Sequence, residues 1–256
     1  MNKVYNTVWN ESTEMWVVTS ELTRKGGRRP RQIRRTALAG LIAGLLLPSA
    51  PALATDYKNQ TLESGGTSSS MSLSAGDTAT NTTINSGGFQ NVHSGGSATS
   101  TTINSGGLQY VYSGGSATST TINSGGQQRV SSGGSATGTT INSGGMLSVS
   151  SGGSAVDITQ NSGGIIFADT SATLRGTNIN GSFSIAGGSA SNMLLENGGE
   201  LSVLNGHQAT STTINSGGQQ RVSSGGSATG TTINSGGMLS VSSGGSAVDI
   251  TQNSGG

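Results

Sequence analysis

The sequence predicts an all-β chain folded as a parallel β-helix, a β-solenoid of about ten coils with 19 residues in each coil. Isoleucine recurs every 19 residues inside the string TTINSGG, at Ile84, Ile103, Ile122 and Ile141. Valine recurs with the same period, shortly before a second Ser-Gly-Gly, at Val92, Val111, Val130 and Val149. A fixed period near 20 residues is typical of solenoids, in which each coil stacks on the one before it.

Each repeat unit follows the consensus SATSTTINSGGxQxVxSGG, in which two short runs, TTIN and xQxV, are each followed by paired glycines. Branched side chains suit a pleated strand, and glycine supplies the positive φ angles that sharp corners need. An α-helix is excluded because no apolar stripe with a 3.6-residue period survives two glycine pairs per unit. Alternating hairpins remain the main structural alternative, but they do not explain why each unit matches the next position by position.

In a parallel solenoid, like residues stack at a spacing of about 4.8 Å. We therefore expect Ala98, Ile103 and Val111 to point inward in their coil, with Thr101 beside them. Stacked asparagines can hydrogen-bond along such a column, and the candidates are Asn85, Asn104, Asn123 and Asn142. Because the core is thin, ladder hydrogen bonds and repetition must supply much of the stability.

The phase of the repeat can be followed along the sequence with one interruption. Positions equivalent to Ile141 are Gln160, Ile179, Leu195, Ile214, Ile233 and Gln252. The step from Ile179 to Leu195 is 16 residues, which predicts a coil three residues short inside an irregular patch at residues 165–208. Residues 117–164 recur unchanged as residues 209–256, and such a duplication indicates a structural role that tolerates lengthening.

The composition excludes several classes of protein. No cysteine is present, which rules out a disulfide framework, a thiolate metal site and a cysteine nucleophile. Beyond residue 54 the sequence holds four basic residues against eight acidic ones, without the clustered basic face that nucleic-acid binding requires. We therefore predict no nucleic-acid partner.

Residues 1–54 are typical of an extended secretory signal peptide. Basic residues gather at residues 24–35, an apolar run follows at residues 37–47, and the small-residue site Ala52-Leu53-Ala54 comes next. The apolar run is too short to cross a bilayer core, which needs about 20 residues. We predict recognition by the Sec translocon and cleavage after Ala54. An N-terminal cap is then expected at residues 55–75 and the solenoid at residues 76–256.

The sequence offers little for catalysis or metal binding. His93 and His207 are the only histidines, and His93 follows an inward valine, so we expect it to be solvated. The glycines lack the Asp of calcium-binding coils and the Lys of phosphate-binding loops. We predict that the chain is not an enzyme and has no cofactor or metal.

Two alternative functions stay open at this point. Carbohydrate-cleaving β-helix enzymes gather carboxylates on one face, and Asp157 and Asp169 are the closest candidates, beside the irregular patch. An ice-binding surface would use threonine pairs on a flat face, at Thr99 with Thr101, Thr118 with Thr120, and Thr137 with Thr139.

The leader and the repeat together resemble the self-associating autotransporter adhesins of the AIDA type. The leader resembles the extended signal region of type V secreted proteins at Met1, Asn2, Lys3, Tyr5, Trp9, Asn10, Trp16, Val17, Ser20 and Glu21. The repeat SGGSATxTTINSGG carries the rest of the resemblance. Two-partner secreted, haemagglutinin-like adhesins share this leader, so they are the alternative family.

The resemblance implies a right-handed β-helix passenger, exported through the periplasm to the surface of a Gram-negative cell. It implies self-association between passengers, autoaggregation, biofilm formation and attachment to host cells, which are traits of a virulence adhesin. It also implies that a cytoplasmic heptosyltransferase attaches heptose to corner serines. The candidate acceptors are Ser94, Ser113, Ser131, Ser132, Ser150, Ser151, Ser223, Ser224, Ser242 and Ser243. Because the family ends in a translocator domain, we expect residues 1–256 to be an N-terminal fragment.

Overall fold

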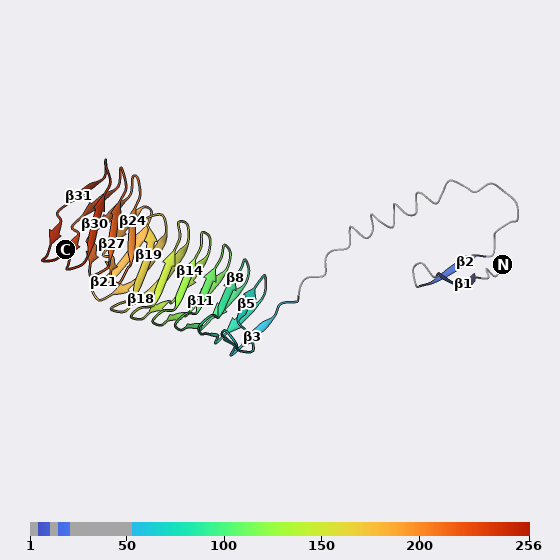
Figure 1. Cartoon of the computed structure of the whole chain (residues 1–256). Coiled ribbons are helices and arrows are strands. Elements are labelled where there is room, and N and C mark those ends of the chain that lie inside the picture. Colours follow the sequence, from blue (N-terminus) through green and yellow to red (C-terminus); the bar gives the residue numbers. More distant parts are fainter. Residues whose placement is uncertain (1–4, 11–14, 21–52) are drawn as a thin grey trace, which may run out of the picture. The chain divides into compact units, whose positions relative to one another are not determined.

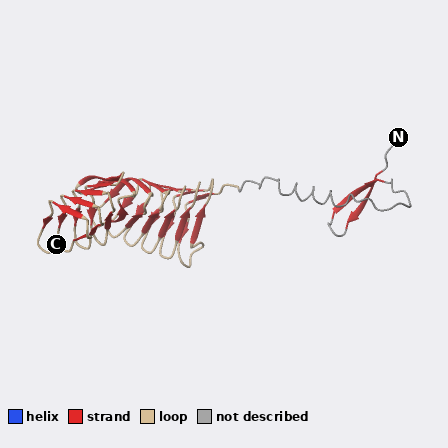
Figure 2. Ribbon diagram, turned by 90° about the horizontal axis from the view of Figure 1, so that it is seen from above, coloured by secondary structure: helices blue, strands red, loops and turns tan. Residues whose placement is uncertain are grey.

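The computed structural model describes residues 5–10, 15–20 and 53–256 of the chain, which divide into two units between residues 52 and 53 (Figures 1 and 2). In the first unit, β1 (Tyr5–Asn10) pairs antiparallel with β2 (Met15–Ser20). The basic run at residues 24–35, the apolar run at residues 37–47 and Ala52 lie outside the described residues. Within the described ranges, no helix is long and apolar enough to cross a membrane.

Residues 53–256 form the predicted β-solenoid, and each coil contains three strands rather than the two that the repeat suggested. In one coil these are β12 (Ser116–Thr118), β13 (Thr121–Ile122) and β14 (Gln127–Val130). The Ser-Ala-Thr segment is the additional strand. Ser119 separates it from the next strand with a φ of 57°, so the backbone breaks there without a Ser-Gly-Gly corner.

The strands stack in parallel on their counterparts in neighbouring coils. The first strands are β3 (Asp56–Lys58), β6 (Thr78–Thr80), β9 (Ser97–Thr99), β12, β15 (Ser135–Thr137), β18 (Ser154–Gln160), β25 (Gln208–Thr210), β28 (Ser227–Thr229) and β31 (Ser246–Val248). The second strands are β4 (Thr61–Leu62), β7 (Thr83–Ile84), β10 (Thr102–Ile103), β13, β16 (Thr140–Ile141), β23 (Leu194–Leu195), β26 (Thr213–Ile214), β29 (Thr232–Ile233) and β32 (Thr251–Gln252), and β18 also supplies this position in its coil.

The third strands form one nine-stranded parallel sheet, called here the third-strand sheet, and Figure 1 shows several of its members side by side. They are β5 (Ser70–Leu73), β8 (Phe89–Val92), β11 (Leu108–Val111), β14, β17 (Met146–Val149), β19 (Ile165–Asp169), β24 (Glu200–Val203), β27 (Gln219–Val222) and β30 (Met238–Val241). Ile103 pairs with Ile122 and Val111 with Val130, so the register is the 19-residue period itself.

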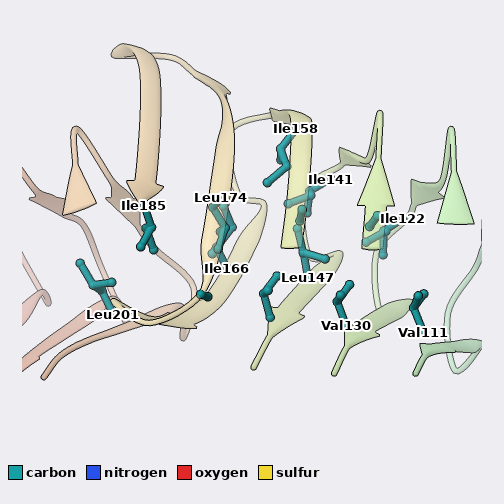
Figure 3. Packing of buried hydrophobic residues seen from close by; sticks show 14 of the residues in the cluster. Val111, Ile122, Val130, Ile141, Leu147, Ile158, Ile166, Leu174, Ile185 and Leu201 are labelled. Carbon is teal, nitrogen blue, oxygen red and sulfur yellow. The ribbon is translucent and has the colours of Figure 1, made fainter. Parts of the chain in front are cut away.

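The core consists of the predicted apolar columns. Ala98, Ile103 and Val111 have no exposed surface, and Thr101 beside them is 1% exposed. Figure 3 shows Val111, Val130, Ile122 and Ile141 projecting into the interior of successive coils. Burial of this apolar surface is the main stabilising contribution. It contributes about 25 cal/mol per Å² and is repeated in every coil.

Two ladders of amide side chains run along the solenoid. The predicted asparagine ladder is present: Asn104 donates to Asn85, and Asn123 donates to Asn104, each at 2.8 Å. The second ladder was not predicted. Gln109 is fully buried and donates to the side-chain oxygen of Gln90 at 2.7 Å, and Gln128 donates to Gln109 at the same distance.

The irregular patch contains an inserted hairpin instead of a shortened coil. β20 (Thr173–Asn178) pairs in parallel with β18, and β21 (Gly181–Ala186) then runs back antiparallel to it. β22 (Ser189–Ser191) turns again and rejoins the parallel stack at β25, while β19 pairs directly with β24. The prediction for Ile179 is therefore wrong, because this residue lies at the hairpin turn and is 65% exposed.

Residues 55–75, expected as a cap, form a coil that continues the register of the solenoid. Leu62 pairs with Ile84 and is buried. The carboxylate of Asp77 ties this coil together, since it accepts hydrogen bonds from the backbone nitrogens of Ser74 (2.8 Å) and Thr55 (2.7 Å). These N–H donors favour the ionised form, so they lower the pKa of Asp77 below its ordinary value.

Candidate functional site

The candidate acceptor serines lie on sharp corners between the third strand of one coil and the first strand of the next. At one such corner the backbone nitrogen of Gly134 donates to the carbonyl oxygen of Ser131 at 2.9 Å, which closes a four-residue turn. Gly133 in this turn has a φ of 72°, which favours glycine at the third position of a type II turn. Ser132 takes the second position, where its side chain is exposed.

The two glycines of each corner have different roles. A β-carbon added at Gly134 would lie 2.5 Å from the carbonyl oxygen of Val111, so this position has no room for a side chain. A β-carbon at Gly133 would lie 2.6 Å from the hydroxyl of Ser113, one coil away. The side chain of Ser113 therefore lies where a β-carbon of residue 133 would be, and the same arrangement repeats from corner to corner. It places the serine hydroxyls in a regular column.

Most of the candidate serines are exposed in the solenoid. The exposed ones are Ser94, Ser113, Ser132, Ser150, Ser151, Ser224, Ser242 and Ser243. Ser131 and Ser223, each at the first position of its turn, are half-buried. The column is interrupted in the irregular patch, where Asn205 stands at the corner position before Gly206.

A second column of corner serines follows the second strands and was not among the candidates. The backbone nitrogen of Gly107 donates to the carbonyl oxygen of Asn104 at 2.8 Å, and Gly106 has a φ of 74°, so the turn is of the same kind. Its exposed serines are Ser86, Ser105, Ser124, Ser143, Ser162, Ser216, Ser235 and Ser254. The repeated Asn-Ser-Gly-Gly was the signal that could have identified them.

The two carboxylates considered for an enzyme do not come together. Asp157 lines a groove of about 690 Å³ beside the inserted hairpin, together with Arg175. Asp169 lines a different depression, of about 210 Å³, with Glu200 on the third-strand sheet. Asp169 also accepts a hydrogen bond from the backbone nitrogen of Ser171 at 2.7 Å, which is a turn-forming role. The part of the chain that the structure describes holds no group of three side chains suited to a metal ion.

The threonine pairs considered for ice binding do not share a face. Thr101, Thr120 and Thr139 are each 1% exposed, and they point into the core beside the glutamine ladder. Thr120, for example, donates to the side-chain oxygen of Gln109 at 3.3 Å. Their partners two residues earlier, Thr99, Thr118 and Thr137, are half-exposed, so the flat double row that ice binding requires is absent from the described coils.

His93 is exposed, as predicted, but it is not isolated. Its ring stacks on the ring of Tyr112 one coil later, with centroids 4.7 Å apart and an angle of 3° between the planes. Tyr110 lies beside Tyr112, and the guanidinium of Arg129 lies 5.7 Å from the centroid of Tyr110. This cluster on the outer face of the third-strand sheet was not recognised in the sequence.

Comparison with known families decides between the remaining alternatives. A family model described as "Adhesin of bacterial autotransporter system, probable stalk" matches residues 57–107, 104–145 and 175–237, more than half of the chain. The chain belongs to this family. A second model, described as the extended signal peptide of the type V secretion system, matches residues 1–50.

Individual relatives agree with this assignment. Over 203 residues, 79% of the chain, it is 89% identical to Autotransporter CRAC of Citrobacter rodentium (strain ICC168). Over 92 residues, 36% of the chain, it is 79% identical to Autotransporter adhesin/invasin TibA of Escherichia coli O78:H11 (strain H10407 / ETEC). The chain spans 13% and 9% of the lengths of these two proteins.

A crystal structure of a TibC-catalyzed hyper-glycosylated TibA fragment is 43% identical to the chain, covers 79% of it and 95% of the fragment, and has a TM-score of 0.44. The expected membership in the AIDA-type adhesins, with similarity to TibA, is confirmed by the sequence relatives. These relatives are named adhesins and autotransporters rather than enzymes or two-partner proteins. The signal model and the relatives indicate export to the surface of a Gram-negative cell.

Proposed function

We propose that the chain is a passenger segment that mediates autoaggregation, biofilm formation and attachment to host cells through its repeated surface. The observation that supports this most is the in-register stacking, which repeats the same outward groups once per coil. Many weak contacts between two such surfaces on facing cells add up, because each contact raises the effective concentration for the next.

The charge distribution supports contact between like surfaces. Beyond residue 54 there are four basic and eight acidic residues, so the net charge is small for a surface of this length. Lys58 pairs with Asp56 at 2.7 Å and Arg221 with Glu200 at 3.3 Å, which reduces the uncompensated charge further. Outward rows of Ser, Thr and Asn then approach each other with little electrostatic repulsion.

The experiment for self-association compares the settling of cells that display the protein with cells that lack it. We expect displaying cells to settle faster, and a mixture of displaying and non-displaying cells to separate as only the former clump. Equal settling rates at equal surface display would contradict the proposal. Attachment to cultured host cells, measured on the same strains, tests the host-binding part separately.

The second part of the proposal is that a cytoplasmic heptosyltransferase attaches heptose to the corner serines. TibA, to which the chain is 79% identical over 92 residues, is glycosylated by TibC in the fragment described above. The candidate serines support this because they lie in fixed turns and most of them are exposed. We expect the intact mass of the exported protein to exceed that of the polypeptide by multiples of a heptose. A mass equal to the polypeptide alone would refute the modification.

The third part concerns cleavage of the leader after Ala54. Thr55 would then become the first residue, and its backbone nitrogen already lies 2.7 Å from the carboxylate of Asp77. Cleavage would turn this nitrogen into an ammonium group, and a charge-assisted hydrogen bond is stronger than a neutral one. N-terminal sequencing of the exported protein is expected to begin at Thr55, and any other first residue would contradict cleavage after Ala54.

A further inference from the structure

A groove of about 500 Å³ runs along the outer face of the third-strand sheet. Its lining includes Tyr110, Tyr112, Arg129, Ser131, Ser148 and Phe167. Register explains its shape: Tyr110, Arg129, Ser148 and Phe167 follow one another in a single column, one per coil. Arg129 and Ser148 therefore lie between Tyr110 and Phe167 in this column.

Tyr112 lines this groove, and its ring also stacks against that of Tyr110, with centroids 5.8 Å apart. On the side of the preceding coil its ring is covered by His93, at 4.7 Å between centroids. On the side of the following coil the residue in the same column is Ser131, which is too small to cover a ring. An aromatic side chain that lines a groove beside hydroxyl groups suits a ligand with an apolar face and a polar edge.

Arg129 supplies a positive charge that has no acidic partner among the described residues. Its guanidinium donates to the side-chain oxygen of Gln127 at 3.0 Å and lies over the ring of Tyr110. The equivalent Arg221 makes the same contact with Gln219, but it also pairs with Glu200 at 3.3 Å. The charge of Arg129 is therefore available to an external anion, whereas that of Arg221 is compensated.

We propose that this groove binds a carboxylated pyranose at the end of a host cell-surface glycan. The apolar C–H face of the sugar ring packs on Tyr112, and the sugar carboxylate accepts hydrogen bonds from Arg129. The hydroxyl of Ser148, which is not among the candidate heptose acceptors, also lines the groove and can pair with a sugar hydroxyl. This inference rests on the proposed role in host attachment and names the ligand class for that role.

The test uses cells that display the protein and lack a heptosyltransferase, so that the hydroxyls of Ser131 and Ser150 remain free. Soluble polymers carrying N-acetylneuraminic acid or glucuronic acid are the probes, and a galactose polymer is the uncharged control. Arg129→Gln is expected to weaken binding of a carboxylated probe about tenfold through loss of one charge-assisted contact, and Tyr112→Ala about tenfold through loss of the ring that packs on the sugar. Tyr112→Phe keeps the ring and should bind as the parent does.

Arg221→Gln is the matched control, because it removes the same side chain from the same local sequence without touching the groove. Surface display of every variant is measured with an antibody, so that misfolding is not read as lost binding. Equal loss in Arg221→Gln and Arg129→Gln, or competition by poly-glutamate as strong as by the sugars, would overturn the proposal. Failure of the parent to bind either acidic sugar would also overturn it, and the settling and host-attachment assays on the same cells would show whether the adhesin function itself stands.

Discussion

Residues 117–164 and residues 209–256 have the same sequence, but the coils that precede them differ. In the first copy, Gln128 donates to the side-chain oxygen of Gln109 at 2.7 Å and continues a buried ladder. In the second copy, the equivalent Gln220 stacks on a leucine, and its side-chain nitrogen has no partner among the described residues. The same glutamine therefore contributes differently to stability in the two copies. The difference arises from its partner in the preceding coil, which is a glutamine in the first copy and a leucine in the second.

The same contrast holds on the outer surface. Arg129 lies over an aromatic ring, and its charge remains available, whereas Arg221 is paired with Glu200. In a solenoid each coil contacts only its neighbours, so stability and surface chemistry are nearest-neighbour properties. A repeat sequence therefore determines its own coil, while the coil beside it determines what its polar groups can do.

The largest expected difference between the copies concerns the second glycine of the corner. Gly134→Ala places a β-carbon 2.5 Å from the carbonyl oxygen of Val111, whereas Gly226→Ala places it 3.0 Å from that of Val203. We expect losses of about 3 kcal/mol and about 1 kcal/mol in unfolding free energy, because the tighter site must move its backbone. Denaturant titration measures the unfolding free energy of the two variants. Equal losses would mean that the preceding coil does not change how well each corner tolerates a β-carbon.

A smaller and qualitatively different effect is expected in the glutamine column. Gln109→Leu interrupts the ladder and should cost about 2 kcal/mol, because buried amide and hydroxyl groups lose partners. Gln220→Leu removes an amide nitrogen that already lacks a partner and leaves only the hydroxyl of Thr231 without its acceptor, so we expect a smaller loss of about 1 kcal/mol. Leu147 shows that leucine fits this column.

Denaturant midpoints together with amide hydrogen exchange, which locates the affected coils, distinguish the two glutamine variants. If Gln220→Leu destabilised the protein as much as Gln109→Leu, the ladder would not be the source of the difference.

The smallest effect separates the first coil from both copies and depends on pH. Because the pKa of Asp77 is lowered in the folded protein, its stabilisation is fully present above its ordinary value of 3.8 and is lost as the pH falls through the lowered pKa. We expect hydrogen exchange near Thr55 and Ser74 to accelerate below about pH 4 relative to exchange in the two copies. Asp77→Asn should show this acceleration already at neutral pH, and an unchanged pH profile in that variant would remove Asp77 as the cause.

The regular coils could be predicted from the sequence because a strict repeat fixes the register by itself. Once Ile103 stacks on Ile122, the positions of the valine, alanine and asparagine columns follow. The buried glutamine was missed because a polar side chain suggests an outward position. The two-residue alternation of a strand places Gln109 on the same face as Val111, and this signal was available.

The inserted hairpin could not be predicted in the same way. Residues 165–208 have no repeat that fixes their register, so a count from Ile179 to Leu195 assigned a coil position to a residue in an exposed turn. The aromatic groove was missed for a related reason, since its wall at Phe167 belongs to the irregular patch. The corner serines were predictable because the turn needs Ser-Gly-Gly, although only one of the two columns was chosen.

The central claim is that the repeated surface, and no single site, mediates self-association. Its most direct test removes two whole coils, residues 116–153, which joins Gly115 to Ser154 and preserves the Ser-Gly-Gly-Ser-Ala register. The measurement is the settling rate of cells displaying the shortened protein at the same level as the parent. We predict that the shortened protein is displayed and that its cells still settle faster than cells without it. Settling as slow as that of non-displaying cells, with normal surface display, would contradict the claim.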